Sequence, residues 1–196
     1  NSHGHLTQMP ADLGDMGVAV TRRPVQDHHR HYQAWSDTGL AYEIIAMDPG
    51  QELTGTLLEM WNNLRLRGIS RWVSPSLKAQ AERSSFTTLQ ALRAGVFTQE
   101  PIGIASASDS IIMVMSALPP TTPLTELGEN ASDEILDRAW EQLHYAHTRG
   151  ISHRALTPEA VVVDASSDVW LLDWDRGEVA TTDLNKSIDV AQMLVL

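Results

Sequence analysis

Residues 143–175 read LHYAHTRGISHRALTPEAVVVDASSDVWLLDWD, and the order of elements within them predicts the architecture of the chain. A helix that begins at the N-cap candidate Ser132, with acids in its first turn, ends at Gly150. A polar loop follows, and then two apolar runs, 160–163 and 169–172, flank a polar turn as the strands of a hairpin do. A helix, a loop and a hairpin in this order predict an α+β fold.

In the remainder of the chain, glycine and proline also mark the turns and the ends of the expected elements. Apolar residues at strand or helix spacing predict further elements on both sides of the quoted stretch. The expected elements are a hairpin over 32–47, helices over 52–67 and 76–93, a strand over 111–115 and a final helix that begins near Ile188.

Residues 118–123, LPPTTP, give the clearest linker signal, because three prolines in six residues oppose regular structure. This linker predicts two lobes. We expect residues 1–13 to be a disordered N-terminus or an added remnant, and residues 14–117 to form a small N-lobe. Residues 118–196 then hold the linker and a truncated C-lobe.

Composition narrows the class of protein. The chain has 196 residues, of which 42% are hydrophobic and 20% are charged, as in ordinary globular domains. A net charge of −11 argues against nucleic acid or an anionic lipid surface as the main partner. The absence of cysteine excludes disulfides and thiolate zinc sites. No apolar run reaches the roughly 18 residues of a spanning helix, no signal peptide opens the chain, and the apolar end 191–196 suggests an excised domain.

Two groups of histidines are candidates for metal binding or for packing. His28, His29 and His31 lie in a polar stretch without a further ligand at metal-binding spacing, so a solvated segment is expected there. His144 and His147 lie one turn apart, and His147 falls on the apolar side of its helix. We expect His147 to be a packed, hydrogen-bonded histidine.

Residues 143–175 resemble the catalytic half of the protein-kinase fold. His153-Arg154-Ala155 stands where that family has His-Arg-Asp, and Ala160 stands at the Asn five residues further on. Asp173-Trp174-Asp175 stands at Asp-Phe-Gly. The resemblance implies a bilobal fold, with a small N-lobe sheet plus helices and a truncated, mainly helical C-lobe.

The departures from the kinase pattern fall on the residues that carry the reaction. In that family the loop Asp accepts the substrate proton, while the Asn and the Asp of Asp-Phe-Gly hold magnesium. The methyl groups of Ala155 and Ala160 do neither, so Asp173 is left as the only possible metal ligand. Ile45 stands at the Lys that pairs with phosphates, Glu82 is the nearest helix acid, and no glycine-rich loop precedes the strand. These vestigial positions predict that the chain has no phosphotransferase activity.

A closer resemblance covers residues 16–196. The chain is similar to the kinase-like cytoplasmic domain of bacterial polytopic membrane proteins classed as lysylphosphatidylglycerol-synthase-like or flippase-like. The resemblance implies that Asp189 braces the catalytic loop, and it places Ser116, Leu118 and Asp173 at nucleotide-contacting positions. The matching runs are 47–67, 80–89, 93–96, 115–118 and 187–192.

These observations predict a regulatory or scaffolding pseudokinase at the cytoplasmic face of the bacterial inner membrane. Its expected partner is the membrane domain of the parent protein or another cytoplasmic protein, with no nucleic acid and no cofactor. One alternative is an atypical ATP-binding or residually active small-molecule or lipid kinase that uses Asp173 with magnesium. A second alternative is a freestanding soluble domain that binds a partner protein.

Overall fold

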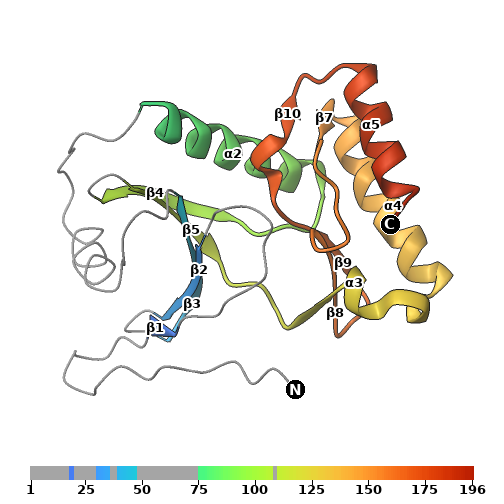
Figure 1. Cartoon of the computed structure of the whole chain (residues 1–196), viewed down its shortest axis with the longest axis horizontal. Coiled ribbons are helices and arrows are strands. Elements are labelled where there is room, and N and C mark those ends of the chain that lie inside the picture. Colours follow the sequence, from blue (N-terminus) through green and yellow to red (C-terminus); the bar gives the residue numbers. More distant parts are fainter. Residues whose placement is uncertain (1–17, 20–29, 36–38, 48–74, 108–109) are drawn as a thin grey trace. The chain divides into compact units, whose positions relative to one another are not determined.

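The computed structural model of the chain describes residues 18–19, 30–35, 39–47, 75–107 and 110–196. These residues form an α+β fold with antiparallel sheets and four α-helices (Figure 1). None of the described helices combines the length and the apolar character needed to span a bilayer. The described residues therefore show the α+β class that the order of elements predicted.

The chain divides into two compact units. The first is made of residues up to Ala81 together with Pro101–Ala117, and the second of Glu82–Glu100 together with Leu118–Leu196. The predicted N-lobe included residues 82–100, which belong to the second compact unit. These residues join the second unit because the backbone carbonyl of Phe97 accepts a hydrogen bond from Leu171 N–H at 2.9 Å.

The first unit contains a five-stranded antiparallel sheet in the order β1-β2-β3-β5-β4. Strands β2 and β3 form the predicted hairpin, and β3 also pairs with β5, so that Ile45 lies opposite Met113. The strands predicted over 41–47 and 111–115 are thus neighbours in one sheet. The strands are β1 (Val18–Ala19), β2 (Arg30–Trp35), β3 (Ala41–Met47), β4 (Pro101–Ala107) and β5 (Ser110–Ser116).

Both faces of this sheet carry buried apolar side chains. Ile44 and Ile112 belong to a cluster on one face, whereas Met47 and Met113 belong to a cluster on the other. The second cluster includes Ala81 from α2 (Pro75–Ala94). Because successive strand residues point to opposite faces, the near-continuous apolar run of β5 is what a strand buried on two sides requires.

The second unit combines helices with two small sheets, a three-stranded sheet in the order β6-β8-β9 and a two-stranded pair, β10-β7. Helices α4 and α5 pack together on one side of this unit (Figure 1). Its elements are β6 (Thr121–Pro123), α3 (Leu124–Leu127), η1 (Gly128–Asn130), α4 (Asp133–Thr148), β7 (Ile151–Ser152), β8 (Val161–Asp164), β9 (Val169–Leu171), η2 (Trp174–Arg176), β10 (Glu178–Val179) and α5 (Asp183–Met193).

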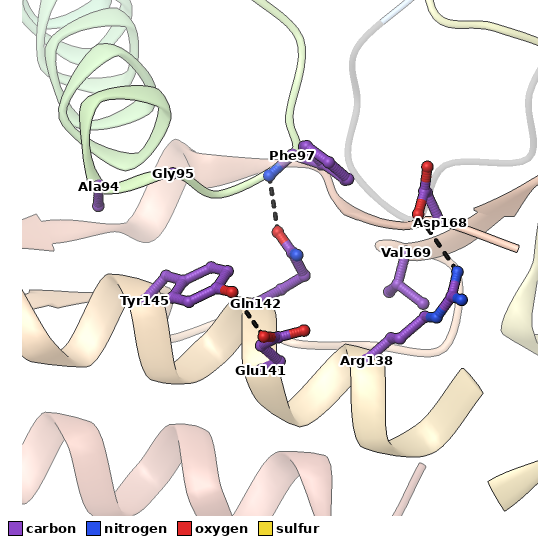
Figure 2. Close-up of a pocket in the computed structure, with 9 residues that line it drawn as sticks. All are labelled: Ala94, Gly95, Phe97, Arg138, Glu141, Gln142, Tyr145, Asp168 and Val169. Carbon is purple, nitrogen blue, oxygen red and sulfur yellow. Dashed lines mark hydrogen bonds and ion pairs between the residues drawn. The ribbon is translucent and has the colours of Figure 1, made fainter. Parts of the chain in front are cut away.

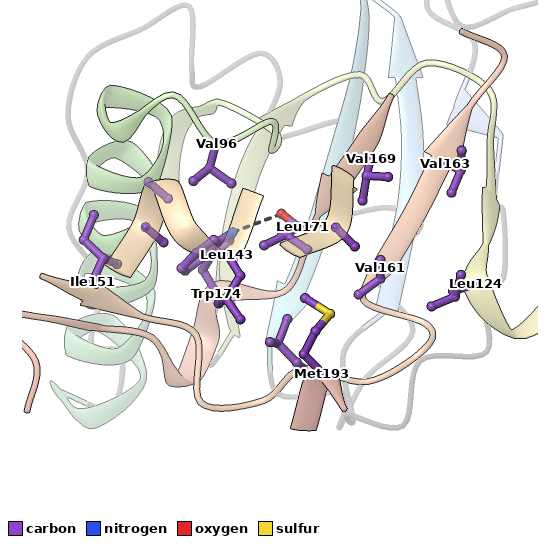
Figure 3. Close-up of a cluster of buried hydrophobic side chains, with 14 residues drawn as sticks. Val96, Leu124, Leu143, Ile151, Val161, Val163, Val169, Leu171, Trp174 and Met193 are labelled. Atoms are coloured by element: carbon purple, nitrogen blue, oxygen red, sulfur yellow. Dashed lines mark hydrogen bonds between the residues drawn. The ribbon is translucent and has the colours of Figure 1, made fainter. Parts of the chain in front are cut away.

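The core of the second unit gathers side chains from α4, the hairpin β8–β9 and α5 (Figure 3). Leu143 and Leu171 are fully buried in it, and Met193 closes it from α5. Trp174 is also buried, and its indole Nε1 donates a hydrogen bond to the backbone carbonyl of Leu171 at 3.0 Å. This bond satisfies the one polar atom of the indole side chain, so Trp174 fits the core without an unpaired donor.

Helix α4 begins and ends as its sequence predicted. The hydroxyl of Ser132 accepts a hydrogen bond from Ile135 N–H at 3.4 Å, and Asp133 and Glu134 lie in the first turn. At the other end Gly150 adopts a φ of 70°, which glycine reaches without steric cost.

Two expectations for the second unit are wrong. Residues 121–123 of the proline-rich stretch form β6, in which Thr122 pairs with Val163. Strand β6 lies at the edge of its sheet, where Pro123 need not donate to a further strand. The last helix begins at Asp183 rather than near Ile188, because Thr182 caps it by accepting from Asn185 N–H. The predicted helix over 52–67 and the predicted disorder of residues 1–13 lie outside the described residues.

Candidate functional site

Asp189, in α5, is a fully buried carboxylate that holds the loop between β7 and β8. Its Oδ2 accepts a hydrogen bond from His153 N–H at 2.8 Å, and its Oδ1 accepts one from Arg154 N–H at 2.5 Å. The Nε2–H of His147 donates to Oδ2 at 2.9 Å, so His147 is hydrogen-bonded as expected. The two backbone donors fix the start of the loop to α5, and His147 joins the same carboxylate to α4.

The backbone of Leu172 joins three of the predicted site positions. Its N–H donates to the carbonyl of Ala160 at 2.8 Å, and its carbonyl accepts from His153 Nε2 at 2.6 Å. Because Asp173 follows Leu172 directly, this clamp sets the position from which the Asp173 side chain leaves the chain. The structure thereby brings His153, Ala160 and Asp173 into one cluster.

His153 is held in one tautomer by its surroundings. A carbonyl can only accept, so Nε2 carries the proton that is donated to Leu172, and Nδ1 is left without a partner among the described residues. The ring is completely buried and lies 4.6 Å from the ring of Trp174, centroid to centroid. Burial lowers the pKa of His153, against smaller opposing effects of Leu172 and Asp189, and therefore favours the neutral imidazole.

Asp173 in the cluster and Arg154 beside His153 adopt left-handed backbone conformations that side chains disfavour. Arg154 has a φ of 65°, and Asp173 has a φ of 62° with a ψ of 56°. Such conformations persist where the surroundings over-determine them, and they concentrate at functional sites. Here Asp189 fixes the N–H of Arg154, and the Leu172 clamp precedes Asp173.

Asp175, which stands at the glycine of Asp-Phe-Gly, has a structural contact of its own. The buried hydroxyl of Ser84, in α2, donates a hydrogen bond to Asp175 Oδ1 at 2.7 Å. Asp175 lies inside the 3₁₀ turn η2, and the left-handed residue of the motif is Asp173.

The other predicted positions are distributed over both units. Ile45 and Ser116 belong to the first unit, where Ile45 packs against the apolar cluster that contains Met47. Glu82 and Leu118 belong to the second unit, where Glu82 is exposed and Leu118 is half-buried. An isoleucine packed into a sheet core has no group that pairs with a phosphate.

The histidine, aspartate and glutamate side chains of the described residues were candidates for metal binding. In those residues no three His, Asp or Glu side chains gather closely enough to hold a metal ion. His28 and His29 lie outside the described residues. His31 does not have the solvated setting expected for it, because its side chain is buried and its Nδ1 lies 2.7 Å from Glu43 Oε1.

Two of the positions singled out from the sequence carry alanine side chains. Ala160 is buried and Ala155 is half-buried, and neither side chain accepts a proton or binds a cation. Asp173 supplies the one carboxylate among the three cluster positions.

Sequence reasoning missed the contacts that organise this cluster. The clamp of Leu172 uses backbone atoms, which leave no mark in the side-chain pattern. The Ser84–Asp175 bond joins residues 91 positions apart, and neither residue type signals the other. The one signal in the sequence was the serine of α2 at position 84, which the structure shows to be buried. A buried hydroxyl needs a hydrogen-bond partner.

Comparison with known protein families and with curated proteins finds no match to this chain.

Proposed function

We propose that the chain is a catalytically degenerate kinase-like domain that acts as a regulatory or scaffolding module of a bacterial membrane protein. One contrast carries the proposal. Asp189 holds the backbone of His153 and Arg154, while Ala155 and Ala160 present methyl groups where phosphoryl transfer needs a carboxylate and an amide.

The chemistry supports an inactive site. Loss of a single positioned base lowers rates by about 10²–10⁴. Here Ala155 removes the base, Ala160 removes a magnesium ligand, and Ile45 packs into a sheet core where a phosphate-pairing lysine would be needed. A net charge of −11 adds an unfavourable field for a triphosphate.

We place this module at the cytoplasmic face of the bacterial inner membrane, with the membrane domain of its parent or another cytoplasmic protein as its partner. The support is the resemblance that runs from residue 16 to residue 196. The acidic surface fits this location, because it limits direct contact of the domain with anionic headgroups.

One observation favours an alternative function, an atypical ATP-binding or residually active kinase. Asp173 retains a left-handed conformation next to a clamped Leu172, as a residue kept for metal binding would. The other alternative, a freestanding partner-binding domain, shares the inactive site and differs only in lacking a membrane parent.

A phosphotransfer assay tests the proposal. Purified protein is incubated with ATP, magnesium and lipid or small-molecule acceptors, and Asp173→Ala is the matched variant. We expect no acceptor phosphorylation above that of Asp173→Ala. Magnesium-dependent phosphorylation by the unmodified protein that Asp173→Ala abolishes would overturn the proposal and establish the alternative kinase.

A further inference from the structure

A hollow of about 560 Å³ lies in the second unit, between α4 and the segments 94–97 and 168–169 (Figure 2). Its volume falls within the roughly 300–1,000 Å³ of ligand pockets. None of the vestigial kinase positions lines it. Its lining contains the buried polar side chain of Gln142 and the carboxylate of Glu141, whose charge no cation in the lining pairs with.

Gln142 supplies a fixed hydrogen-bond donor to this hollow. Its side chain rises from α4 toward the Phe97 backbone and is only 5% exposed (Figure 2). Its Oε1 accepts from Phe97 N–H at 2.7 Å, which sets the orientation of the amide group. No acceptor within the described part of the chain is paired with its Nε2. Nε2 is not among the enclosed polar atoms that lack a partner, so this oriented donor is accessible to the carbonyl of a ligand.

Glu141 supplies a fixed negative charge beside that donor. The hydroxyl of Tyr145 donates to Glu141 Oε1 at 2.5 Å and orients the carboxylate (Figure 2). This hydrogen bond is the main cause of a raised pKa of Tyr145, so the tyrosine stays a neutral donor. Among the described residues nothing engages the second carboxylate oxygen, which leaves it available to a cation.

The single cation in the lining does not balance this charge. Arg138 donates to Ser167 O at 2.8 Å and to Asp168 Oδ1 at 3.2 Å, which ties α4 to the turn of the hairpin. Its other terminal nitrogen donates to Glu134 at 2.8 Å. The guanidinium is therefore already shared between two acids, and Glu141 remains uncompensated.

We infer that this hollow binds an arginine side chain and the adjoining backbone carbonyl of a basic peptide segment from a partner protein. The inference rests on the proposed scaffold function and names its partner's chemistry. The guanidinium would bind Glu141 and stack on the rings of Tyr145 or the exposed Phe97, and Gln142 Nε2 would donate to the carbonyl. The net charge of −11 steers a basic segment toward this domain.

The test is a titration of the ¹⁵N-labelled chain with a short acetylated and amidated Gly/Arg peptide. The control peptide carries citrulline, a neutral isostere, in place of arginine. We expect the arginine peptide to shift the side-chain NH₂ signals of Gln142 and the Phe97 amide signal, and the citrulline peptide to leave them unmoved. Binding should weaken as salt is added.

Two variants of α4 test whether the arginine peptide binds the carboxylate of Glu141. Glu141→Gln removes the proposed anchor and should weaken peptide binding by about tenfold or more. Asp137→Asn makes the same change of charge on an exposed residue that does not line the hollow, and it should change the affinity less than about twofold. Both variants alter exposed helix positions, so both are expected to fold.

Three results would overturn the inference: equal binding of the two peptides, equal loss of affinity in both variants, or Gln142 signals that never move as the arginine peptide is raised to saturation. Failure here is distinguishable from failure of the proposed function, because phosphotransfer is measured separately. A chain that neither binds the peptide nor transfers phosphate remains a pseudokinase without this partner site.

Discussion

The carboxylate of Asp189 accepts a hydrogen bond from the backbone N–H of His153 at 2.8 Å, although 36 residues separate the two in sequence. The bond is fully buried, and the next N–H, that of Arg154, binds the other carboxylate oxygen. Helix α5 thus determines where the loop between β7 and β8 lies.

Asp189→Asn should destabilise the protein by about 1–3 kcal/mol, because an amide group offers one acceptor oxygen to three donors that now share a carboxylate. Chemical denaturation measures the free energy of unfolding. Asp137→Asn is the control, because it changes the same charge at an exposed position of α4, and it should stay within about 0.5 kcal/mol. Equal effects of the two changes would show that the buried brace contributes nothing specific.

His153 should make the free energy of unfolding depend on pH. Burial lowers its pKa in the folded state, so the unfolded chain binds the proton more readily. The stability is fully present above the ordinary value of 6.5 and falls as pH drops below it. His153→Gln keeps an N–H donor for Leu172 but cannot titrate, so its stability curve should be flatter between pH 7.5 and pH 5. Parallel curves for the two proteins would contradict the neutral assignment.

Gly177 allows the segment after Asp173 to pack closely against α2. A Cβ added at this position would lie 2.6 Å from Thr87 Cγ2 and 3.0 Å from Trp174 O. Gly177→Ala should therefore cost about 1–3 kcal/mol in the free energy of unfolding. Thr87→Ser removes the clashing methyl but keeps the hydroxyl that donates to Arg83 O, so adding it to Gly177→Ala should recover part of the loss.

Gly103→Ala is the matched control for that change, because its new Cβ would meet nothing within 4 Å. Its effect on stability should be small. If Gly177→Ala proved as mild as Gly103→Ala, or if Thr87→Ser gave no recovery, the close contact between α2 and this segment would be disproved.

Asp164 organises the turn of the hairpin β8–β9. Its Oδ1 accepts from the N–H groups of Ser166 and Asp168, and its Oδ2 accepts from Trp170 Nε1 at 3.0 Å. Desolvation alone would raise the pKa of Asp164, but these donors and Arg138 outweigh it and hold the pKa below 3.8. The contribution of Asp164 is therefore present above pH 3.8 and is lost as pH falls through the lower, folded-state pKa.

Asp164→Ala should then cost about 1–3 kcal/mol at pH 7. The difference in the free energy of unfolding between the two proteins should hold constant down to about pH 4 and shrink only below it. A cost that already declined between pH 7 and pH 5 would place the titration elsewhere and contradict this assignment.

Local signals predicted much of the fold, and tertiary contacts account for what was missed. Helix α4 and the hairpin β8–β9 follow from capping, spacing and a polar turn, all of which act within a few residues. Strand β6 was missed because its prolines oppose regular structure in general, yet the edge of a sheet tolerates Pro123. The membership of residues 82–100 in the second compact unit was not predictable, because the Phe97–Leu171 bond is a long-range contact.

The candidate site was predictable at the level of positions rather than of contacts. His153, Ala160 and Asp173 were chosen by spacing, and the structure brings them together around Leu172. The contribution of Leu172 itself lies in its backbone and has no side-chain signature. The donor at Gln142 was not predictable from the sequence either, because glutamine is common on helices. Only its burial and the hydrogen bond that orients its amide group distinguish it.

Nucleotide binding is the measurement that tests the central claim, an abandoned phosphoryl-transfer site, most directly. The free energy of unfolding is measured with increasing ATP and magnesium, for the unmodified chain and for Asp173→Asn. A ligand at 100 times its Kd would stabilise the folded state by about 2.7 kcal/mol. The proposed degenerate site predicts no stabilisation in either protein. A saturable, magnesium-dependent rise that Asp173→Asn removes would contradict the account.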